Sequence, residues 1–583
     1  MNESVKGNGF RVNHTERNNS QKQSAPGLET HVSRRSFVRL AGIAGIAAAS
    51  AAGLLGACVS ERRTGGLPPE TPERETEPSE TPTMAPEFEQ EFADAVYGGR
   101  LRIALIDEPP TFDIHQTTTS TTAFVSWHIF EALFTWDDDL RVIPELPETY
   151  TVSDDGLVWS ITLREGVQFH DGAELTPEDV IASIERWGSI SGLGQSLLEH
   201  VQEFEIVDER TFEIQLSDAF GTLPVALSRQ NQGCAIYPAW VIEESEGDDF
   251  QHIIGTGPYR FVEYIPDQHI LLERFEVYTP APGEVDGYGG SKHRFLDQIM
   301  FVAVSEEASR VAGLQAGEFH YLESVGTDQV PAIEEDPSVV VELGEPAFYP
   351  NLVLNHRSEL MKNQHIRRAV QLALDHEPIL QAGYGDGFFR LDPSLLMRET
   401  PWHSLAGAEH FNAYDLQQAD RLLEEAGYDG TALRFMITEA YRDLYNASVV
   451  IAQQLEEAGF VVDVERFDWA TLSDRRNDPD LWDMYLTLAT FRPDPIMRNL
   501  TCEAPGWWCD PDKDELLRLV QTEAEFERRY EHWQDVQRLF YEQVPRIKIG
   551  DTYIVIARSP DLQNSPELTH LQPAFWNSWL DES

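Results

Sequence analysis

LVWSITLREGVQFHDGAELTPEDVIASIERW, residues 157–187, holds the strand, turn and helix signals from which we predict the fold. Its first seven residues predict a β-strand, and a glycine turn leads to a second short strand that ends at the His-Asp-Gly turn of residues 170–172. A helix follows, because Thr176 can cap it, Pro177 suits its first position and Asp179 completes a capping box. This stretch therefore predicts two strands and then a helix.

Strand and helix patterns continue on both sides of this stretch. Apolar residues alternate in residues 98–108 and predict a first strand, whereas residues 365–380 place apolar side chains on one face of a helix. Further on, LLEEAGY (422–428) and QLEEAGF (454–460) each predict a helix that stops at a glycine, and residues 460–468 alternate as a strand does. Helices that lead directly into strands indicate an α/β lobe.

The length and charge of the chain limit its class. The part that begins at residue 98 is too long for one hydrophobic core, so we expect two or three domains. The net charge is −55, and only six of the 44 basic residues are lysines. An acid excess spread over the whole chain is typical of a protein that works in high salt, although an acidic surface that binds cations is an alternative. No basic patch exists to contact phosphates, so we expect no nucleic-acid partner.

SRRSFVRLAGIAGIAAASAAGLLGAC, residues 33–58, has the features of an export signal. Its apolar part, residues 41–55, is shorter than the ~20 residues that a membrane-spanning helix needs and fits a signal peptide. The paired arginines resemble the twin-arginine signal, and the last four residues resemble a lipobox, in which Cys58 is alkylated by diacylglycerol after cleavage. We expect a signal peptide over residues 1–57, twin-arginine export and a membrane anchor at Cys58. A buried apolar helix with a chance cysteine is the alternative.

Residues 58–97 follow the lipobox and are rich in Pro, Glu and Thr, with few large apolar side chains. Such a segment cannot bury enough apolar surface to offset the entropy that it would lose on ordering. We expect a disordered tether that holds the folded part away from the bilayer.

Signals of an enzyme or a metal site are weak. Cys502 and Cys509 are seven residues apart and could close a disulfide loop outside the cytoplasm, with no further ligand nearby at metal-site spacing. Cys234 is expected to be a small buried residue. His170 and Asp171 lie in a predicted turn and are better explained by a structural role. Because no nucleophile has a partner and no His-Glu-x-x-His pattern occurs, we expect no catalytic residue, no metal and no cofactor.

Seven stretches, in order along the chain, resemble the extracytoplasmic solute-binding proteins of the peptide/nickel type (family 5), which supply ATP-driven importers. They are PELPETYTVSDDGLVWSITLREGVQFHDGAELTPEDVIASI (144–184), GTGPYRF (255–261), RVAGLQAGEFHYLESV (310–325), IRRAVQLALD (366–375), YDLQQADRLLEEAGYDG (414–430), WWCDPDKDEL (507–516) and VPRIKIGD (544–551). The resemblance implies an α/β fold of the periplasmic-binding-protein class (type II, cluster C), with two large α/β lobes, an extra small domain and a hinged cleft.

The same resemblance implies domain boundaries. Domain I would consist of residues 98–130, 249–345 and 550–583, domain II of residues 131–248, and domain III of residues 346–549. Two crossovers between the lobes would form a hinge, and the lobes would close around the solute. Closure would present one surface, built from both lobes, to a membrane permease.

The function implied by the resemblance is that of a membrane-anchored receptor without catalytic activity. It would capture a small peptide or peptide-like solute in the cleft and pass it to an ABC permease with ATPase subunits, and we expect it to act as a monomer. One alternative is a secreted hydrolase or metal-dependent enzyme on an α/β body, which would need a triad or a ligand cluster. Another is a solute sensor or peptide chaperone without an importer. Nickel and haem are considered as solutes, after organic ones.

Candidate binding residues come from the same resemblance, because the cleft of peptide-binding relatives is lined by aromatic residues, a carboxylate and an arginine. Trp469 aligns with a tryptophan that contacts the ligand, although a core position is the alternative. Arg390 lies on a loop that faces the cleft in relatives and could bind a carboxylate, with Phe389 beside it as aromatic lining or core. Glu108 follows the first strand at the rim.

Residues 488–502, LATFRPDPIMRNLTC, occupy the place of the acid that binds the α-amino group in relatives. Phe491 and Arg492 stand at the closest position here, and Asp494 matches a downstream Asp-Pro that could be structural. We include all three as candidate ligand-binding residues. Because the expected acid is replaced, a modified peptide, an opine-like molecule or another anion-bearing solute is as plausible as a peptide with a free amino terminus.

Overall fold

The computed structural model describes residues 92, 94–229, 231–245, 252–566 and 572–581, which all belong to one compact unit, residues 84–583. The predicted signal peptide, the lipidated Cys58 and most of the predicted tether lie outside the described residues. Among the helices of the described part, none is long and apolar enough to cross a membrane.

The stretch that opened the sequence analysis folds largely as its local signals predict. Strand β5 spans Val158–Leu163, and helix α3 spans Pro177–Ile190 with Thr176 as its N-cap. The Thr176 backbone N–H donates to Asp179 Oδ2 at 2.9 Å, so the predicted capping box forms. The predicted second strand was wrong, because Gln168 makes only an isolated bridge to Glu174 and no ladder continues from it.

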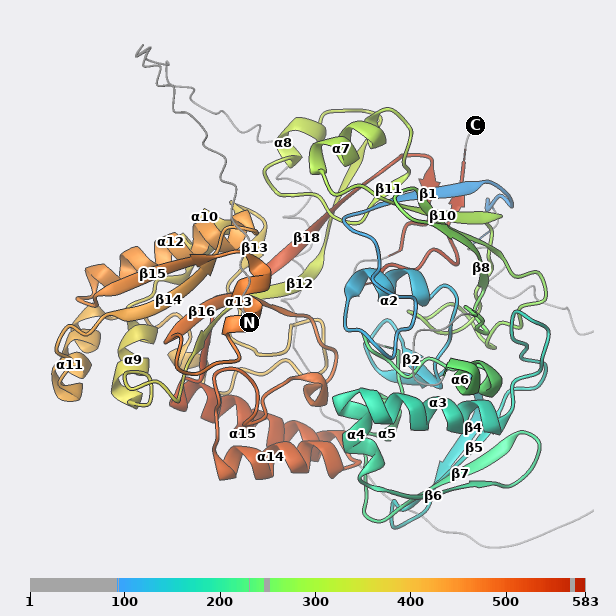
Figure 1. Ribbon diagram of the computed structural model, residues 1–583, viewed down its shortest axis with the longest axis horizontal. Helices are drawn as coiled ribbons and strands as arrows, with labels where there is room; N and C mark the ends of the chain where they lie inside the picture. Colours follow the sequence, from blue (N-terminus) through green and yellow to red (C-terminus); the bar gives the residue numbers. More distant parts are fainter. Residues whose placement is uncertain (1–91, 93, 230, 246–251, 567–571, 582–583) are drawn as a thin grey trace, which may run out of the picture. The chain divides into compact units, whose positions relative to one another are not determined.

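Strand β5 of this stretch belongs to a four-stranded antiparallel sheet with the order β4-β5-β7-β6 (Figure 1). Its other strands are β4 (Pro147–Val152), β6 (Val201–Ile206) and β7 (Thr211–Leu216). Alternate side chains of β5 and β7 point into a core that α3 completes with Ile184 and Trp187. Cys234, predicted to be buried, lies in this core at 1% exposure.

A second, larger sheet runs in the order β15-β14-β16-β12-β18-β11-β1-β10-β9-β8 (Figure 1). The predicted first strand is β1, which pairs in parallel with β10 and β11. The strands of this path are β1 (Arg100–Leu105), β8 (Tyr259–Ile265), β9 (His269–Arg274), β10 (Gln298–Ala303), β11 (Tyr321–Leu322), β12 (Val340–Leu354), β14 (Leu433–Thr438), β15 (Val462–Phe467), β16 (Met484–Thr490) and β18 (Asp551–Arg558).

Strands β12 and β18 are antiparallel partners that lie at the middle of the large sheet (Figure 1). Their register shifts on either side of Pro346, the residue at which the sequence placed the start of domain III. The other predicted crossover, at residues 549–550, falls directly before β18. One predicted crossover thus lies within β12 and the other directly before β18, whereas the hinge itself and the three-domain division stay predictions.

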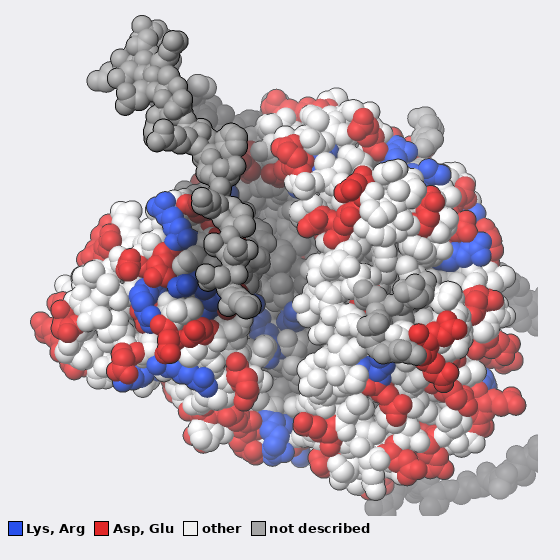
Figure 2. All heavy atoms as spheres, viewed as in Figure 1, with Lys and Arg blue, Asp and Glu red and all other residues white. Residues whose placement is uncertain are grey.

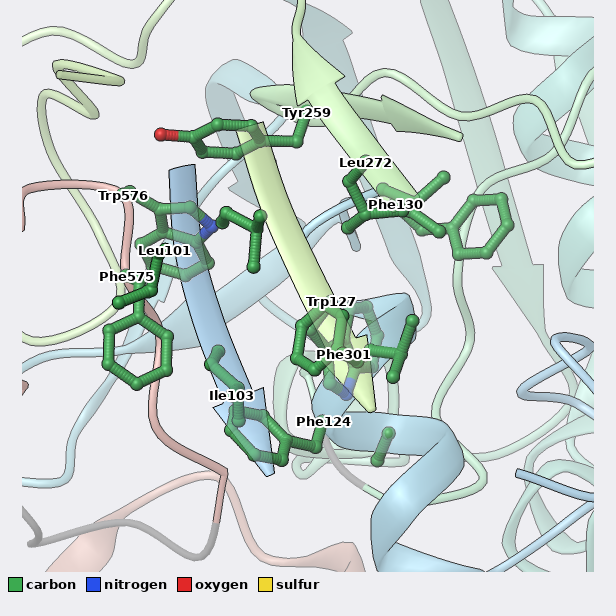
Figure 3. Close-up of a cluster of buried hydrophobic side chains, with 14 of the residues drawn as sticks. Leu101, Ile103, Phe124, Trp127, Phe130, Tyr259, Leu272, Phe301, Phe575 and Trp576 are labelled. Carbon is green, nitrogen blue, oxygen red and sulfur yellow. The ribbon is translucent and has the colours of Figure 1, made fainter. Parts of the chain in front are cut away.

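Separate hydrophobic cores lie on the two sides of this strand pair. One contains Leu101 and Ile103 of β1 and Phe301 of β10, packed against α2 (Ser120–Ser126) and the C-terminal Phe575 and Trp576 (Figure 3). The other combines β12, β14 and β16 with α9 (Gln364–Leu372), α10 (His376–Tyr384), α11 and α12. As predicted, α11 (Leu416–Ala426) and α12 (Arg442–Glu457) end near glycines with positive φ, 67° at Gly427 and 92° at Gly459.

The remaining elements complete the unit. The helices are α4 (Gly192–Leu198), α5 (Leu223–Ala226), α6 (Ala239–Ser245), α7 (Glu307–Gln315), α8 (Val330–Ile333), α9 (Gln364–Leu372), α10 (His376–Tyr384), α13 (Trp469–Arg475), α14 (Pro511–Thr522) and α15 (Phe526–Gln543), with 3-10 turns η2 (Ala408–His410) and η3 (Pro495–Met497). The short strands are β2 (Phe134–Trp136), β3 (Val142–Pro144), β13 (Phe389–Arg390), β17 (Arg546–Lys548), β19 (Leu562–Gln563) and β20 (Trp579–Leu580). Cys502 and Cys509 form a disulfide between η3 and α14.

Candidate solute-binding cavity

A cavity of about 570 Å³ lies between two groups of segments that are far apart in the sequence. The first wall comprises Thr118, Trp136, Ser191, Gly192, Leu193 and Ser196 of the α3–α4 region, Arg229, Asn231, Gln232, Tyr288 and Gln572. The second wall comprises residues of the segment 491–501 and of α14, namely Leu517, Val520 and Gln521. Figure 2 shows that this face of the molecule is hollowed between the part that carries α9–α13 and the part that carries α2 and α3, with Lys or Arg atoms visible inside the hollow.

The charges that line the cavity have one sign. Arg229, Arg492 and Arg498 line it, and none of the described lining residues is an aspartate or a glutamate. This is unusual in a chain with 99 acidic and 44 basic residues. Acidic side chains instead cover much of the outer surface in Figure 2.

Arg229 stands on the first wall, shortly after the C-cap of α5, and is 5% exposed. Its guanidinium lies 4.0 Å from the ring centroid of Tyr288 and 4.6 Å from that of Trp576. Its backbone is fixed, because Trp136 Nε1 donates to the Arg229 carbonyl at 2.9 Å. Burial lowers the pKa of Arg229 to about 10, so the side chain stays charged at neutral pH.

Arg498 and Arg492 stand on the second wall. The Arg498 guanidinium lies 4.9 Å from the ring centroid of Tyr349, and it makes no hydrogen bond or ion pair to any residue that the structure describes. Burial and repulsion from Arg546 lower the pKa of Arg498 to about 9. Arg492 Nη1 donates to the Phe491 carbonyl at 3.1 Å, and burial lowers its pKa as well.

A buried ion pair fixes the loop that carries these two arginines. Asp494 caps η3 by accepting from the Ile496 N–H at 3.0 Å. Both carboxylate oxygens of Asp494 also accept from Arg529 Nη2, at 2.8 and 2.9 Å, and the two residues are 2% and 7% exposed. Asp494 therefore positions the loop and does not itself line the cavity.

The cavity brings together two of the seven residues that the sequence suggested for the site. Phe491 and Arg492 line it, whereas Trp469, at the start of α13, packs edge-on against the Tyr441 ring and lies outside it. Phe389 lies in β13, where it is half-buried and pairs with Thr552 of β18.

The charged candidates Arg390 and Glu108 also lie outside this cavity, and their polar atoms are occupied. Arg390 donates to Glu399 at 2.6 and 2.7 Å and to Asp551 at 2.9 Å. Burial alone would lower the pKa of Arg390, but the two carboxylates raise it. Glu108 accepts from the Tyr264 hydroxyl and the Asp267 N–H, each at 2.8 Å. A direct role of these residues in binding stays a prediction.

Sequence reasoning missed Arg229 and Arg498. Arg498 lies within the LATFRPDPIMRNLTC stretch, six residues after Arg492, so its cationic side chain was a signal that could have been used. Arg229 follows a short helix that has no binding motif, and its place in the cavity depends on contacts with aromatic residues distant in sequence.

Residues 141–507, more than half of the chain, match the family described as bacterial extracellular solute-binding proteins, family 5. A probable peptide ABC transporter periplasmic-binding protein of Sinorhizobium fredii, y4tO, is 27% identical over 507 residues, which cover 82% of this chain and 92% of that protein. Two solved structures share the fold: AppA of Bacillus subtilis with a nonapeptide (TM-score 0.67, 20% identity, 84% of this chain and 100% of that one), and AgaA of A. tumefaciens R10 with agropinic acid (TM-score 0.69, 21% identity, 83% and 99%).

The fold class predicted from the sequence is therefore confirmed, because both structures are binding proteins of the same mixed α/β architecture. The family match extends from β3 to the disulfide loop and includes most of both cavity walls. On this match, the chain belongs to the family 5 bacterial extracellular solute-binding proteins.

Proposed function

We propose that this protein is a binding protein without catalytic activity, which encloses a small peptide or peptide-like solute in the cavity and delivers it to an ABC importer. The observation that carries the proposal is the cavity of about 570 Å³ whose two walls come from opposite sides of the β12–β18 pair. Its volume is within the usual range for small-ligand sites, about 300–1,000 Å³. Arginine, amide and aromatic side chains on the walls can orient a polar solute.

The names of related proteins support delivery to an importer. The Sinorhizobium fredii relative is named as a peptide ABC transporter binding protein. AppA holds a nonapeptide and AgaA holds agropinic acid, so proteins of this fold enclose both peptides and other organic solutes. We therefore propose a permease with ATPase subunits as the partner, and a monomeric receptor.

Membrane attachment is part of the proposal and depends on the N-terminal sequence. Residues 33–58 combine the twin-arginine pattern with a lipobox, and a diacylglyceryl group on Cys58 would anchor the chain stably. In a cell that expresses the full chain, Cys58→Ser is expected to move the protein from the detergent phase to the aqueous phase. Equal partition of the two forms would contradict lipidation.

Solute release and uptake test the central proposal. The full chain with Cys58→Ser is purified and denatured, and the small molecules that it releases are identified by mass spectrometry. Each is then titrated back by calorimetry, and its uptake is compared in cells with and without the gene. Binding without turnover, together with gene-dependent uptake, is expected. Chemical conversion of the solute, or uptake independent of the gene, would contradict the proposal.

A further inference from the structure

The three cavity arginines have fewer acceptors than other buried or half-buried arginines of the described chain. Several of those pair with a carboxylate, as in Arg186–Asp113, Arg390–Glu399, Arg434–Asp483, Arg529–Asp494 and Arg558–Glu342. Others, Arg164, Arg310 and Arg367, each donate to two or more backbone carbonyls. In contrast, Nη1 and Nη2 of Arg229 are buried and have no hydrogen-bond partner among the described residues. The Arg498 guanidinium has none either, and Arg492 has only the carbonyl of its neighbour.

The acids nearest to Arg229 already have other donors. Glu131 accepts from Thr256, Tyr278 and Lys292, at 2.9, 2.7 and 3.1 Å. Glu145 accepts from the Ala132 N–H and from Lys292. These carboxylates reduce the electrostatic cost of a buried Arg229 but leave its terminal nitrogens without a hydrogen bond.

An unpaired buried guanidinium is costly, because it loses its hydration without gaining a partner. Cation–π contacts with Tyr288 and Trp576 return only part of that cost and fix the direction of the side chain. The arrangement is explained if an anionic group of the solute supplies the missing partner. A carboxylate matches the planar fork of a guanidinium with two parallel hydrogen bonds.

We propose that the cavity binds an organic polyanion, a solute with at least two carboxylate or similar acidic groups, one held by Arg229 and another by Arg492 and Arg498. This inference deepens the proposed function, since it specifies the solute class for the same cavity. The arginines stand on opposite walls, so a solute with two anionic groups bridges them. A peptide with a free α-ammonium group is disfavoured, because no described lining residue offers it a carboxylate.

Matched probes test the charge of the solute. N-acetyl-Glu-Glu carries three carboxylates and no ammonium, and N-acetyl-Gln-Gln-amide has nearly the same shape without charge; citrate and Lys-Lys-amide extend the comparison. Each is titrated into the full chain with Cys58→Ser by calorimetry at constant ionic strength. The expected result is binding of the polyanions at least about tenfold tighter than of the uncharged and cationic peptides. Equal or tighter binding of the uncharged or cationic peptides would overturn the inference, and so would a released native solute without acidic groups.

Arginine variants locate the binding to this cavity. Arg492→Gln and Arg498→Gln are each expected to weaken polyanion binding about tenfold or more, and Arg229→Met by at least as much. Arg357→Gln is the control, because Arg357 is exposed, lies outside the cavity and places its guanidinium 5.0 Å from the ring centroid of Trp507. Circular dichroism checks the fold of each variant. If Arg229→Met does not fold, the affinities of Arg492→Gln and Arg498→Gln test the assignment. Unchanged affinity in both of those variants would overturn the assignment.

The outcomes separate this inference from the proposed function. If uncharged peptides bind and their uptake depends on the gene, the polyanion inference fails and the proposed function stands. If polyanions bind in an arginine-dependent manner but their uptake does not depend on the gene, the inference stands and delivery to an importer fails.

Discussion

Gln521 of α14 donates a hydrogen bond from Nε2 to the hydroxyl oxygen of Ser196 in α4, at 2.8 Å. Both residues line the cavity, so the bond joins its second wall to its first. The Gln521 carbonyl also accepts from Thr222 Oγ1 at 3.0 Å, and the Thr522 carbonyl accepts from the Gly221 N–H at 3.1 Å. These three bonds hold the two walls together at one edge of the cavity.

Removal of the Gln521 side chain is expected to loosen this edge. Gln521→Ala deletes one hydrogen bond worth about 1 kcal/mol, which corresponds to about fivefold faster release of the solute if the bond forms only in the closed state. Stopped-flow measurement of the dissociation rate tests this. Gln453→Ala is the matched control, since the Gln453 side chain bonds Glu457 on the exposed side of α12. Equal release rates in the two variants would show that the edge does not limit release.

Gly221 offers a stronger test of the contact between the two cavity walls, because a side chain at this position cannot coexist with the observed approach to Glu523. A Cβ atom at Gly221 would lie 2.3 Å from the Glu523 carbonyl oxygen, well inside van der Waals contact. Gly221→Ala is therefore expected to push the walls apart, which increases the radius of gyration in X-ray scattering and weakens solute binding about tenfold or more. A variant with unchanged scattering and affinity would mean that the backbone at Glu523 shifts without opening the cavity.

The ion pair between Asp494 and Arg529 should contribute strongly to stability. Asp494→Asn leaves the buried Arg529 without a countercharge, and breaking such a pair costs about 3–5 kcal/mol. Chemical unfolding measures the loss. The exposed pair Asp139–Arg141 gives the control, because Asp139→Asn is expected to cost less than about 1 kcal/mol. A similar small loss in both variants would show that Asp494 does not hold the loop of Arg492 and Arg498.

Local sequence signals predicted many helices and strands of the fold. The residues that line the cavity, in contrast, come together through contacts between segments that are distant in the sequence. The cap at Thr176 and the glycine at Gly427 depend on residues within one or two turns, and both were predicted correctly. A strand after Gly166 was predicted wrongly, because a strand exists only where a partner continues the ladder, and Gln168 has one bridge. Arg229 joins the cavity through rings that come from other segments, so no local pattern could have identified it.

His128 predicts a pH dependence of stability. Its Nδ1 donates to the Phe124 carbonyl at 2.9 Å and its Nε2 accepts from the Phe575 N–H at 3.2 Å, so both nitrogens are satisfied in the neutral ring. Burial and the positive charge of Arg229 lower the pKa of His128 to about 3. Since the unfolded-state pKa is about 6.5, the neutral ring stabilises the fold fully above that pH, and the contribution falls by about 1.4 kcal/mol per unit as the pH drops toward 3.

Comparison with His128→Asn isolates this contribution from that of other acid-sensitive groups. The free energy of unfolding is measured at pH 7.5 and 5.5 for both proteins. The decrease between the two values is expected to be larger in the unmodified protein by about 1.4 kcal/mol, whatever the absolute stability of the variant. Parallel pH profiles would mean that the pKa of His128 is not lowered in the folded state.

High salt is expected to stabilise the protein, because its net charge of −55 creates strong self-repulsion at low ionic strength. The Debye length falls from about 10 Å at 0.1 M to about 3 Å at 1 M, so most repulsion between exposed carboxylates is screened there. The melting temperature at pH 7.5 should therefore rise between 0.1 and 2 M KCl.

The same series at pH 4.5, close to the isoelectric point of about 4.5, provides the control, since the net charge is then near zero and the salt effect should be much smaller. Equal salt effects at both pH values would assign the stabilisation to salt exclusion instead of charge screening, and a flat profile at pH 7.5 would contradict adaptation to high salt.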